Sequence, residues 1–289
     1  MIRTISRVGA AMALAAALGF SGILAAGPAQ ASPATSVAAT SSHYRGAVKY
    51  VALGDSYAAG QGALPYENAC LQSDDSYPEV LDQARRVNLV ADPSCSGATT
   101  TDLVVNQLPA IQKNRKIGLV TVTVGANDLN TAAVAAACSV SFESVECQAA
   151  LAAANALLTP PADGVPSELA VRLTSTFTSV AAATPRATIL VTGYPYLFET
   201  PAPTDPNYAT VAQLNAATAA LNDTIRGVVT QLAQSGTDIR YVDVTAAFVG
   251  HGIGSADPWI NSTGIEAFHP TAAGYLAYAA ALQAELRRR

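Results

Sequence analysis

The sequence predicts an α/β protein with a three-layer α/β/α architecture and a doubly wound, parallel sheet. Short, uncharged segments rich in β-branched residues alternate with Ala-rich helical segments along most of the 289 residues. Hydrophobic residues make up 50% of the chain and charged residues only 13%, which suits strands that are buried on both faces. A chain of this length can also bury one large core.

Five segments are expected to form the strands. The clearest is 117–124 (IGLVTVTV), and the others are 48–53, 87–90, 187–191 and 239–244. Helices are expected at 74–86, 101–113, 131–157, 166–183, 208–235 and 271–287. Strands that alternate with helices in this way give a flavodoxin-like sheet of about five strands, with ligand sites at the carboxyl ends of the strands.

The N-terminal region indicates export. Residues 1–31 have two arginines, an Ala/Leu-rich run and the tripeptide Ala29-Gln30-Ala31, which together are typical of a secretory signal peptide. A transmembrane anchor is the alternative, but the apolar run is short. Residues 32–46 are rich in Ser, Thr, Ala and Pro, which predicts a flexible lead-in before a domain at 47–289. We therefore expect a secreted, extracellular protein with no transmembrane segment after signal removal.

The net charge and the cysteines indicate which partners, disulfides and metals to expect. The net charge is −5, without a basic stripe, so we expect no nucleic-acid partner, and we expect a monomer. An exported chain with four cysteines is expected to form disulfides. Three pairings are possible, and proximity favours Cys70–Cys95 and Cys138–Cys147. No C-x-x-C motif or cluster with metal-ligand spacing occurs, so we expect no metal.

Four short motifs lie at the expected ends of strands and helices. They are Gly54-Asp55-Ser56-Tyr57, Cys95-Ser96-Gly97-Ala98, Gly125-Ala126-Asn127-Asp128 and Phe268-His269-Pro270. Each motif by itself is also typical of an ordinary loop. Together they contain the nucleophile, base and oxyanion donors that acyl transfer requires. G-x-S-x-G is absent, which disfavours the common α/β-hydrolase elbow.

Ser56 is the candidate nucleophile, because it lies on a strand-to-helix turn. The base follows by elimination among three histidines: His43 lies in the lead-in, His251 lies in a Gly-rich loop, and His269 directly precedes a helix that begins with Pro270. The candidate oxyanion donors are the backbone N–H groups of Ser56 and Gly97 and the side-chain amide of Asn127.

These motifs resemble the SGNH hydrolases, also called the GDSL lipase/esterase family, from about Lys49 to the C-terminus. The variant GDSY and the cysteine positions resemble the secreted bacterial lipase/esterase branch, including two of its disulfides. The resemblance implies a serine ester hydrolase that acts through an acyl-enzyme without a cofactor. It assigns the nucleophile to Ser56, the base to His269 and the oxyanion hole to Gly97 and Asn127.

One position departs from the family. Its members usually carry Asp three residues before the histidine, where it orients the imidazole, and this chain has Glu266. Three alternatives stay open for this role: the Glu266 carboxylate, a backbone carbonyl such as that of Ala267, or another acid such as Asp257.

The walls of the substrate pocket are expected from residues 57–69, 194–208 and 245–268, the last two rich in aromatic residues such as Trp259. The substrate is expected to be a small-molecule or lipid ester. A phospholipase, a polysaccharide deacetylase and a catalytically inactive binding protein on the same fold are the alternatives.

Overall fold

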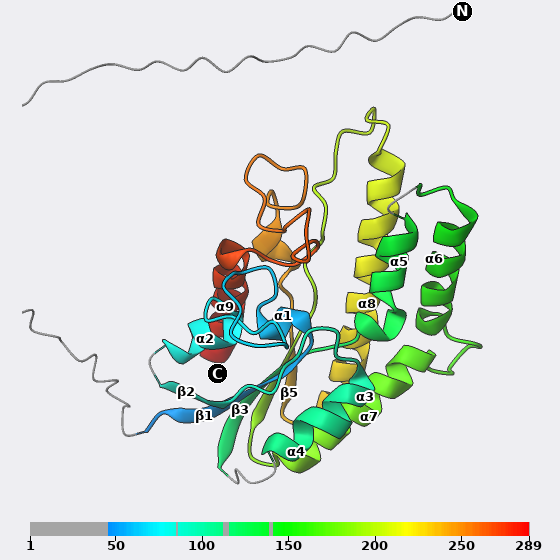
Figure 1. Cartoon of the computed structure of the whole chain (residues 1–289). Coiled ribbons are helices and arrows are strands. Elements are labelled where there is room, and N and C mark those ends of the chain that lie inside the picture. Colours follow the sequence, from blue (N-terminus) through cyan, green and yellow to red (C-terminus); the bar gives the residue numbers. More distant parts are fainter. Residues whose placement is uncertain (1–45, 85, 112–115, 139–140, 289) are drawn as a thin grey trace, which may run out of the picture. The chain divides into compact units, whose positions relative to one another are not determined.

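The structure is a computed structural model that describes residues 46–84, 86–111, 116–138 and 141–288. The expected signal peptide, residues 32–45 of the lead-in and His43 lie outside the described residues. The described residues form a five-stranded parallel sheet in the order β2-β1-β3-β4-β5 (Figure 1), which confirms the predicted fold class. The strands are β1 (Val48–Gly54), β2 (Val87–Ala91), β3 (Ile117–Thr123), β4 (Thr188–Thr192) and β5 (Ile239–Val242).

Helices cover both faces of this sheet (Figure 1). Those described are α1 (Ser56–Ala59), α2 (Tyr77–Asp82), α3 (Thr100–Asp102), α4 (Leu108–Ile111), α5 (Thr131–Cys138), α6 (Val145–Leu158), α7 (Glu168–Ala183), α8 (Tyr208–Gln234) and α9 (Ala272–Arg287). A π-helical turn, Leu103–Gln107, joins α3 to α4. Helices α2 and α9 pack together on one face, whereas α4, α7 and α8 pack on the other. Among these described helices, none is both long and apolar enough to cross a bilayer.

The strand order reverses between β1 and β3, because the chain passes from β1 outward to β2 and then back across to β3. In doubly wound sheets, the crevice at this reversal, at the carboxyl ends of the strands, is the usual ligand site. The motifs that contain Ser56 and Asn127 follow β1 and β3 directly, so the topology brings them to this crevice.

The central strands are buried on both faces, although β3 carries threonines. Thr121 and Thr123 are fully buried. Their hydroxyls pair with those of two buried tyrosines, Tyr50 at 2.7 Å and Tyr77 at 2.9 Å. Each buried hydroxyl therefore has a partner, which offsets the cost of removing it from water.

The prediction of one helix over 131–157 is wrong, because this segment forms two helices. α5 ends at Cys138, and α6 begins at Val145 after Ser144, whose hydroxyl accepts the Cys147 N–H at 3.1 Å. The Ala-rich composition favours helix throughout, but it does not say where the chain turns. Ser144, a preferred N-cap residue, is the local signal for the break. The helix expected at 74–86 is also shorter, and α1 was not expected as a separate helix.

Both disulfides form as proximity favoured. Cys70 pairs with Cys95, and Cys138 pairs with Cys147. The first links the segment after α1 to the loop after β2, whereas the second closes the hairpin of α5 and α6. Every residue of α5 keeps some exposure, so this helix contributes little to the core, although Leu157 and Leu158 of α6 pack against it.

The two disulfides should therefore differ in their effect on stability. Replacing both Cys70 and Cys95 by serine should lower the free energy of unfolding by about 3 kcal/mol, because the bond constrains a long loop of the unfolded chain. The matched control replaces Cys138 and Cys147, and its main effect should be faster amide hydrogen exchange in α5 and α6. Urea unfolding and hydrogen exchange measure both effects, and an equal loss of global stability in the two double variants would contradict this expectation.

Candidate active site

Ser56 lies at the first position of α1, directly after β1. Asp55 caps this helix, and its carboxylate accepts the Tyr57 N–H at 3.0 Å. The turn requires Gly54, because its φ is +140° and a Cβ there would lie 2.1 Å from the carbonyl oxygen of Thr123 on β3. Ser56 is only 6% exposed, so the fold holds its hydroxyl at the carboxyl edge of the sheet, nearly shielded from solvent.

His269 reaches Ser56 from the segment before α9. Its Nε2 lies 2.8 Å from Ser56 Oγ, and its Nδ1 lies 2.8 Å from the carbonyl oxygen of Ala267. Because a carbonyl only accepts hydrogen bonds, Nδ1 carries the ring proton and Nε2 can accept the serine hydroxyl. The Glu266 carboxylate instead lies 3.4 Å from the Tyr66 hydroxyl. Of the three alternatives, the Ala267 carbonyl is the group that contacts Nδ1.

The other two sequence candidates, His251 and Asp257, contact each other. His251 Nδ1 lies 2.8 Å from the Asp257 carbonyl oxygen and 3.3 Å from its carboxylate. The His251 ring stacks on Trp259, with ring centroids 3.4 Å apart. These contacts hold the loop of residues 250–259 together and involve neither Ser56 nor His269.

The segment that carries His269 is held by residues that sequence reasoning missed. Phe268 has φ +66°, an uncommon conformation for a large side chain. The Tyr57 hydroxyl donates to the Phe268 carbonyl at 2.6 Å, and the side-chain amide of Asn261 donates to the His269 carbonyl at 3.0 Å. The sequence signal for Tyr57 was its replacement of leucine in GDSL, but only the structure gives its hydroxyl a partner.

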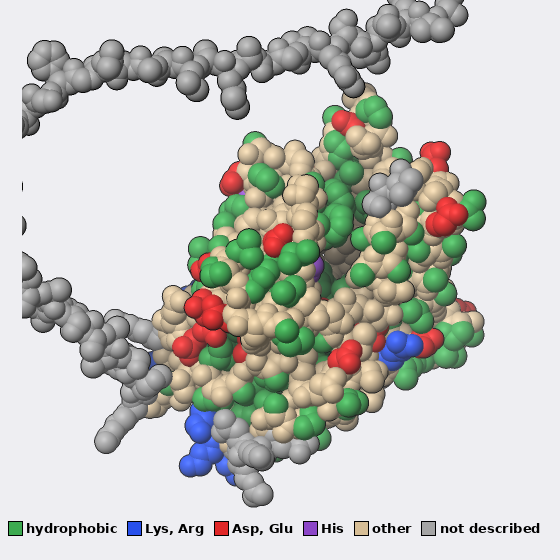
Figure 2. Space-filling model, in the orientation of Figure 1, with side chains coloured by type: hydrophobic (Ala, Val, Ile, Leu, Met, Phe, Trp, Pro, Cys, Tyr) green, Lys and Arg blue, Asp and Glu red, His purple; other side chains and the backbone are tan. Residues whose placement is uncertain are grey.

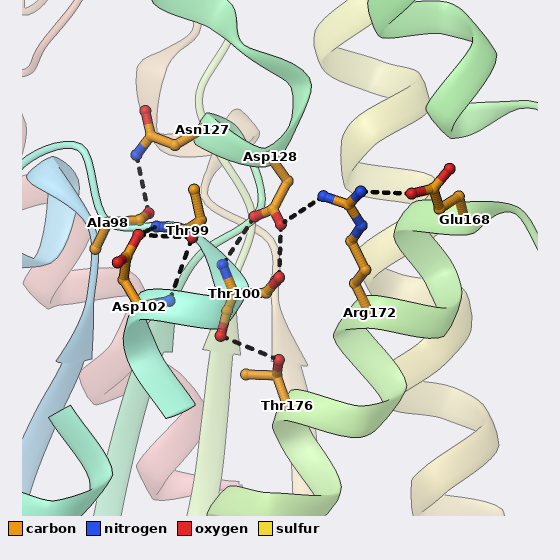
Figure 3. Close-up of polar contacts among 9 residues, drawn as sticks. All are labelled: Ala98, Thr99, Thr100, Asp102, Asn127, Asp128, Glu168, Arg172 and Thr176. Atoms are coloured by element: carbon orange, nitrogen blue, oxygen red, sulfur yellow. Dashed lines mark hydrogen bonds and ion pairs between the residues drawn. The ribbon is translucent and has the colours of Figure 1, made fainter. Parts of the chain in front are cut away.

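The two candidate oxyanion donors outside α1 also come close. The Asn127 side-chain amide donates to the Ala98 carbonyl oxygen at 3.0 Å, directly beside Gly97 (Figure 3). Gly97 has φ +81°, and a Cβ added to it would meet nothing within 4 Å among the described residues. Glycine is therefore favoured there by the left-handed backbone, not by a close approach of neighbouring atoms. An amide that spends one N–H on Ala98 keeps a second N–H for a ligand.

Burial changes the acid–base properties of the site. Burial lowers the pKa of His269, although the carbonyls of Ala267 and Glu266 and the Glu266 carboxylate oppose this shift. Burial also raises the pKa of Asp55 to about 7, against the opposing hydrogen bonds from Tyr194 and Tyr57. A lowered pKa keeps the His269 imidazole neutral, as a proton acceptor must be.

Two further residues support the turn that carries Ser56. Gln107 holds both backbone groups of Gly54, with its side-chain oxygen and nitrogen each 2.8 Å from their partners. Tyr194 was expected in a pocket wall, but its hydroxyl is buried and donates to the Asp55 carboxylate at 2.5 Å. Sequence reasoning missed Gln107, since a glutamine inside a helical segment has no local signal for such a contact.

Segments 194–208 and 245–268 do line a cavity together. It has a volume of about 140 Å³ and includes the aromatic side chains of Tyr196, Phe198 and Phe248. Phe198 also packs against Phe268, with ring centroids 6.2 Å apart, so the cavity wall continues to the residue beside His269. Figure 2 shows this face of the molecule hollowed beside the loops that precede α9, with apolar side chains along the rim.

The chain is similar to bacterial lipases over most of its length. It is 31% identical over 261 residues to Lipase 1 of Streptomyces coelicolor, covering 87% of this chain and 90% of that protein. It is 30% identical over 236 residues to a lipase of Streptomyces rimosus, covering 79% of this chain and 82% of that protein.

Solved structures give the same result. The extracellular lipase of Streptomyces rimosus superposes with a TM-score of 0.71 at 28% identity, and phospholipase A1 of Streptomyces albidoflavus with 0.71 at 32% identity. Each comparison covers 82% of this chain and 99% of the other. Residues 52–277 match the sequence model of the GDSL-like lipase/acylhydrolase family. The chain therefore belongs to the GDSL-like lipase/acylhydrolase family and is a carboxylic ester hydrolase.

Proposed function

We propose that this hydrolase works through an acyl-enzyme formed on Ser56, with His269 as the general base. The observation that carries the proposal is the line of contacts from Ser56 Oγ to His269 Nε2 and from Nδ1 to the Ala267 carbonyl, each 2.8 Å long. As Ser56 attacks the ester carbonyl, Nε2 takes the hydroxyl proton and then gives it to the departing alcohol. A water molecule repeats the sequence and releases the acid.

The Ala267 carbonyl acts in this proposal where a carboxylate acts in a triad. Its oxygen accepts the Nδ1–H, which selects the productive tautomer and favours the imidazolium that forms during the attack. Because a carbonyl carries only a partial charge, it stabilises the imidazolium less than a carboxylate would. The site is thus proposed as a Ser–His dyad.

The negative charge of the tetrahedral intermediate has three proposed donors. They are the backbone N–H groups of Ser56 and Gly97 and the free N–H of the Asn127 amide. Ser56 is the first residue of α1, so its N–H has no carbonyl partner within the helix. Gly97 lies in an exposed loop and has a left-handed backbone. Because it has no side chain, a substrate can approach its N–H closely, which supports a role for this group as a donor.

The proposed substrate is a lipid ester whose acyl chain or head group lies along the aromatic cavity. The similarity to phospholipase A1 of Streptomyces albidoflavus supports a phospholipid as the second candidate.

The protein is also proposed to be secreted as a monomer, with residues 1–31 as signal peptide, 32–46 as lead-in and 47–289 as the hydrolase domain. The signal-like sequence, the two disulfides and the extracellular Streptomyces rimosus relative support secretion.

The nucleophile is tested with nitrophenyl esters of increasing chain length. Ser56→Ala should lower kcat by at least about 10⁴-fold, because no other group forms the acyl-enzyme. Turnover that survives in the folded variant would overturn the mechanism. Among the wild-type results, a preference for acetyl esters would favour the deacetylase, hydrolysis of phosphatidylcholine would favour the phospholipase, and no turnover of any ester would contradict the assignment as a hydrolase.

The pH profile tests the base. Since only neutral His269 accepts the proton, kcat/KM should rise with pH and level off above an apparent pKa below 6.5. Glu266→Gln removes a charge that favours protonation, so this limb should shift slightly to lower pH while kcat stays within about twofold. A loss above tenfold would indicate that the carboxylate orients His269. Asp55→Asn is the control for the buried Asp55 carboxyl. This variant should leave the acidic limb of the kcat/KM profile at the wild-type pH.

Secretion is tested by expressing the full chain in a bacterial host that exports proteins. The mature protein in the medium should begin at Ser32, as read by N-terminal sequencing. A cell-associated product that still begins at Met1 would contradict the signal peptide.

A further inference from the structure

The proposed oxyanion donors belong to loops that are separate in the sequence. Gly97 follows β2, and Asn127 follows β3. An oxyanion hole works only if its donors are held about 2.7–3.1 Å from the position of the developing charge. Contacts that join the two loops therefore decide whether both donors reach the same oxygen atom.

Asp128 makes such contacts from the position directly after Asn127. Its carboxylate accepts the Thr100 backbone N–H at 2.9 Å and the Thr100 hydroxyl at 2.5 Å (Figure 3). Thr100 is the first residue of α3, three positions after Gly97. Both partners are buried, with Asp128 7% and Thr100 2% exposed. The Asp128 side chain thus joins the turn of one donor to the helix start that follows the other.

A second set of contacts attaches this pair to α7. Arg172 of α7 lies 3.5 Å from the Asp128 carboxylate, and it also pairs with Glu168 (Figure 3). The Thr176 hydroxyl, also on α7, is 3.5 Å from the Thr100 carbonyl oxygen. The Thr100 groups and Arg172 give the buried Asp128 carboxylate polar partners, which offset part of the cost of burying it.

We propose that Asp128 is a positioning residue that sets the spacing between Gly97 and Asn127, and so completes the oxyanion hole. This inference rests on the proposed function of those two donors. Asp128 does not touch the ester in this role. It acts through Thr100 on one side and through the turn of Asn127 on the other, so its loss should weaken binding of the transition state while the ground state is bound as before.

Asp102, on α3 itself, provides a matched control. Its carboxylate also accepts a backbone N–H and a hydroxyl from one threonine, Thr99, at 3.0 and 2.6 Å. This capping box stabilises the start of α3, but it involves no residue of the Asn127 turn. Asp102→Ala therefore removes a similar pair of hydrogen bonds without separating the two donors.

The test compares Asp128→Ala with Asp102→Ala, using a short nitrophenyl ester. Asp128→Ala should lower kcat by about 10- to 100-fold with KM within about threefold, less than the full loss of one oxyanion donor. An alkyl boronic acid forms a tetrahedral adduct on serine, and its inhibition constant should rise by a similar factor. Asp102→Ala should keep kcat within about twofold, although both variants lower the thermal midpoint.

Two milder variants separate positioning from general damage. Asp128→Asn should retain most of kcat, because its amide can accept the Thr100 N–H and donate to the Thr100 hydroxyl. Thr100→Val keeps the buried shape, removes one of the two bonds and should give an intermediate loss. If Asp128→Ala does not fold, Thr100→Val carries the test against Asp102→Ala.

Three results would overturn the inference. They are a folded Asp128→Ala enzyme with wild-type kcat, an equal loss of kcat in Asp102→Ala, and a loss that lies entirely in KM. The fraction of active sites is counted with a fluorophosphonate, so that unfolded protein is not mistaken for slow enzyme. Turnover that does not depend on Ser56 would signal failure of the proposed function instead, because the Asp128 comparison presumes Ser56-dependent turnover.

Discussion

The close approach of Gly54 to β3 is the constraint on which the rest of the site depends. At this point a Cβ would overlap the Thr123 carbonyl, so a glycine lets β1 pair with β3 to its last residue and then turn sharply into α1. The Gly54 carbonyl also accepts the Cys95 N–H at 3.1 Å, which joins the loop of Gly97 to the same point. The side chain of Gln107 holds both backbone groups of Gly54. Gly54 is therefore the point at which the turn after β1, the end of β3 and the loop of Gly97 are fixed relative to one another.

Tyrosine hydroxyls connect the region around Gly54 to the C-terminal part of the site. The Tyr57 hydroxyl reaches the Phe268 carbonyl, and the Tyr275 hydroxyl of α9 reaches the Gln61 carbonyl at 2.6 Å. The Tyr194 hydroxyl joins Asp55 to the Ala126 N–H, which precedes Asn127. Tyrosine suits this task because its ring fills the apolar core while its hydroxyl can donate to one buried polar group and accept from another. The site is thus supported by the core itself, not by flexible surface contacts.

The low charge content of the chain shapes the electrostatics of the site. In an interior with few ionised groups, an unpaired charge is costly, and the buried groups respond in different ways. His269 has a lowered pKa and stays neutral, and Asp55 has a pKa raised to about 7. Asp128 instead has hydrogen bonds from Thr100 and a nearby arginine.

The sequence by itself determined the class of fold and the motifs that approach the crevice. Strand periodicity, helix caps and glycine turns are local properties, so five strands could be predicted, with Ser56, Gly97 and Asn127 after three of them and His269 before the last helix. Tertiary structure alone decided which group contacts His269 Nδ1, since the Glu266 carboxylate and the Ala267 carbonyl are neighbours in the sequence and the folded loop directs only the carbonyl to the ring. The contacts of Tyr57, Gln107 and Asp128 join residues that are 28 or more positions apart. No local pattern encodes such distances, because they arise only when the strands and helices pack.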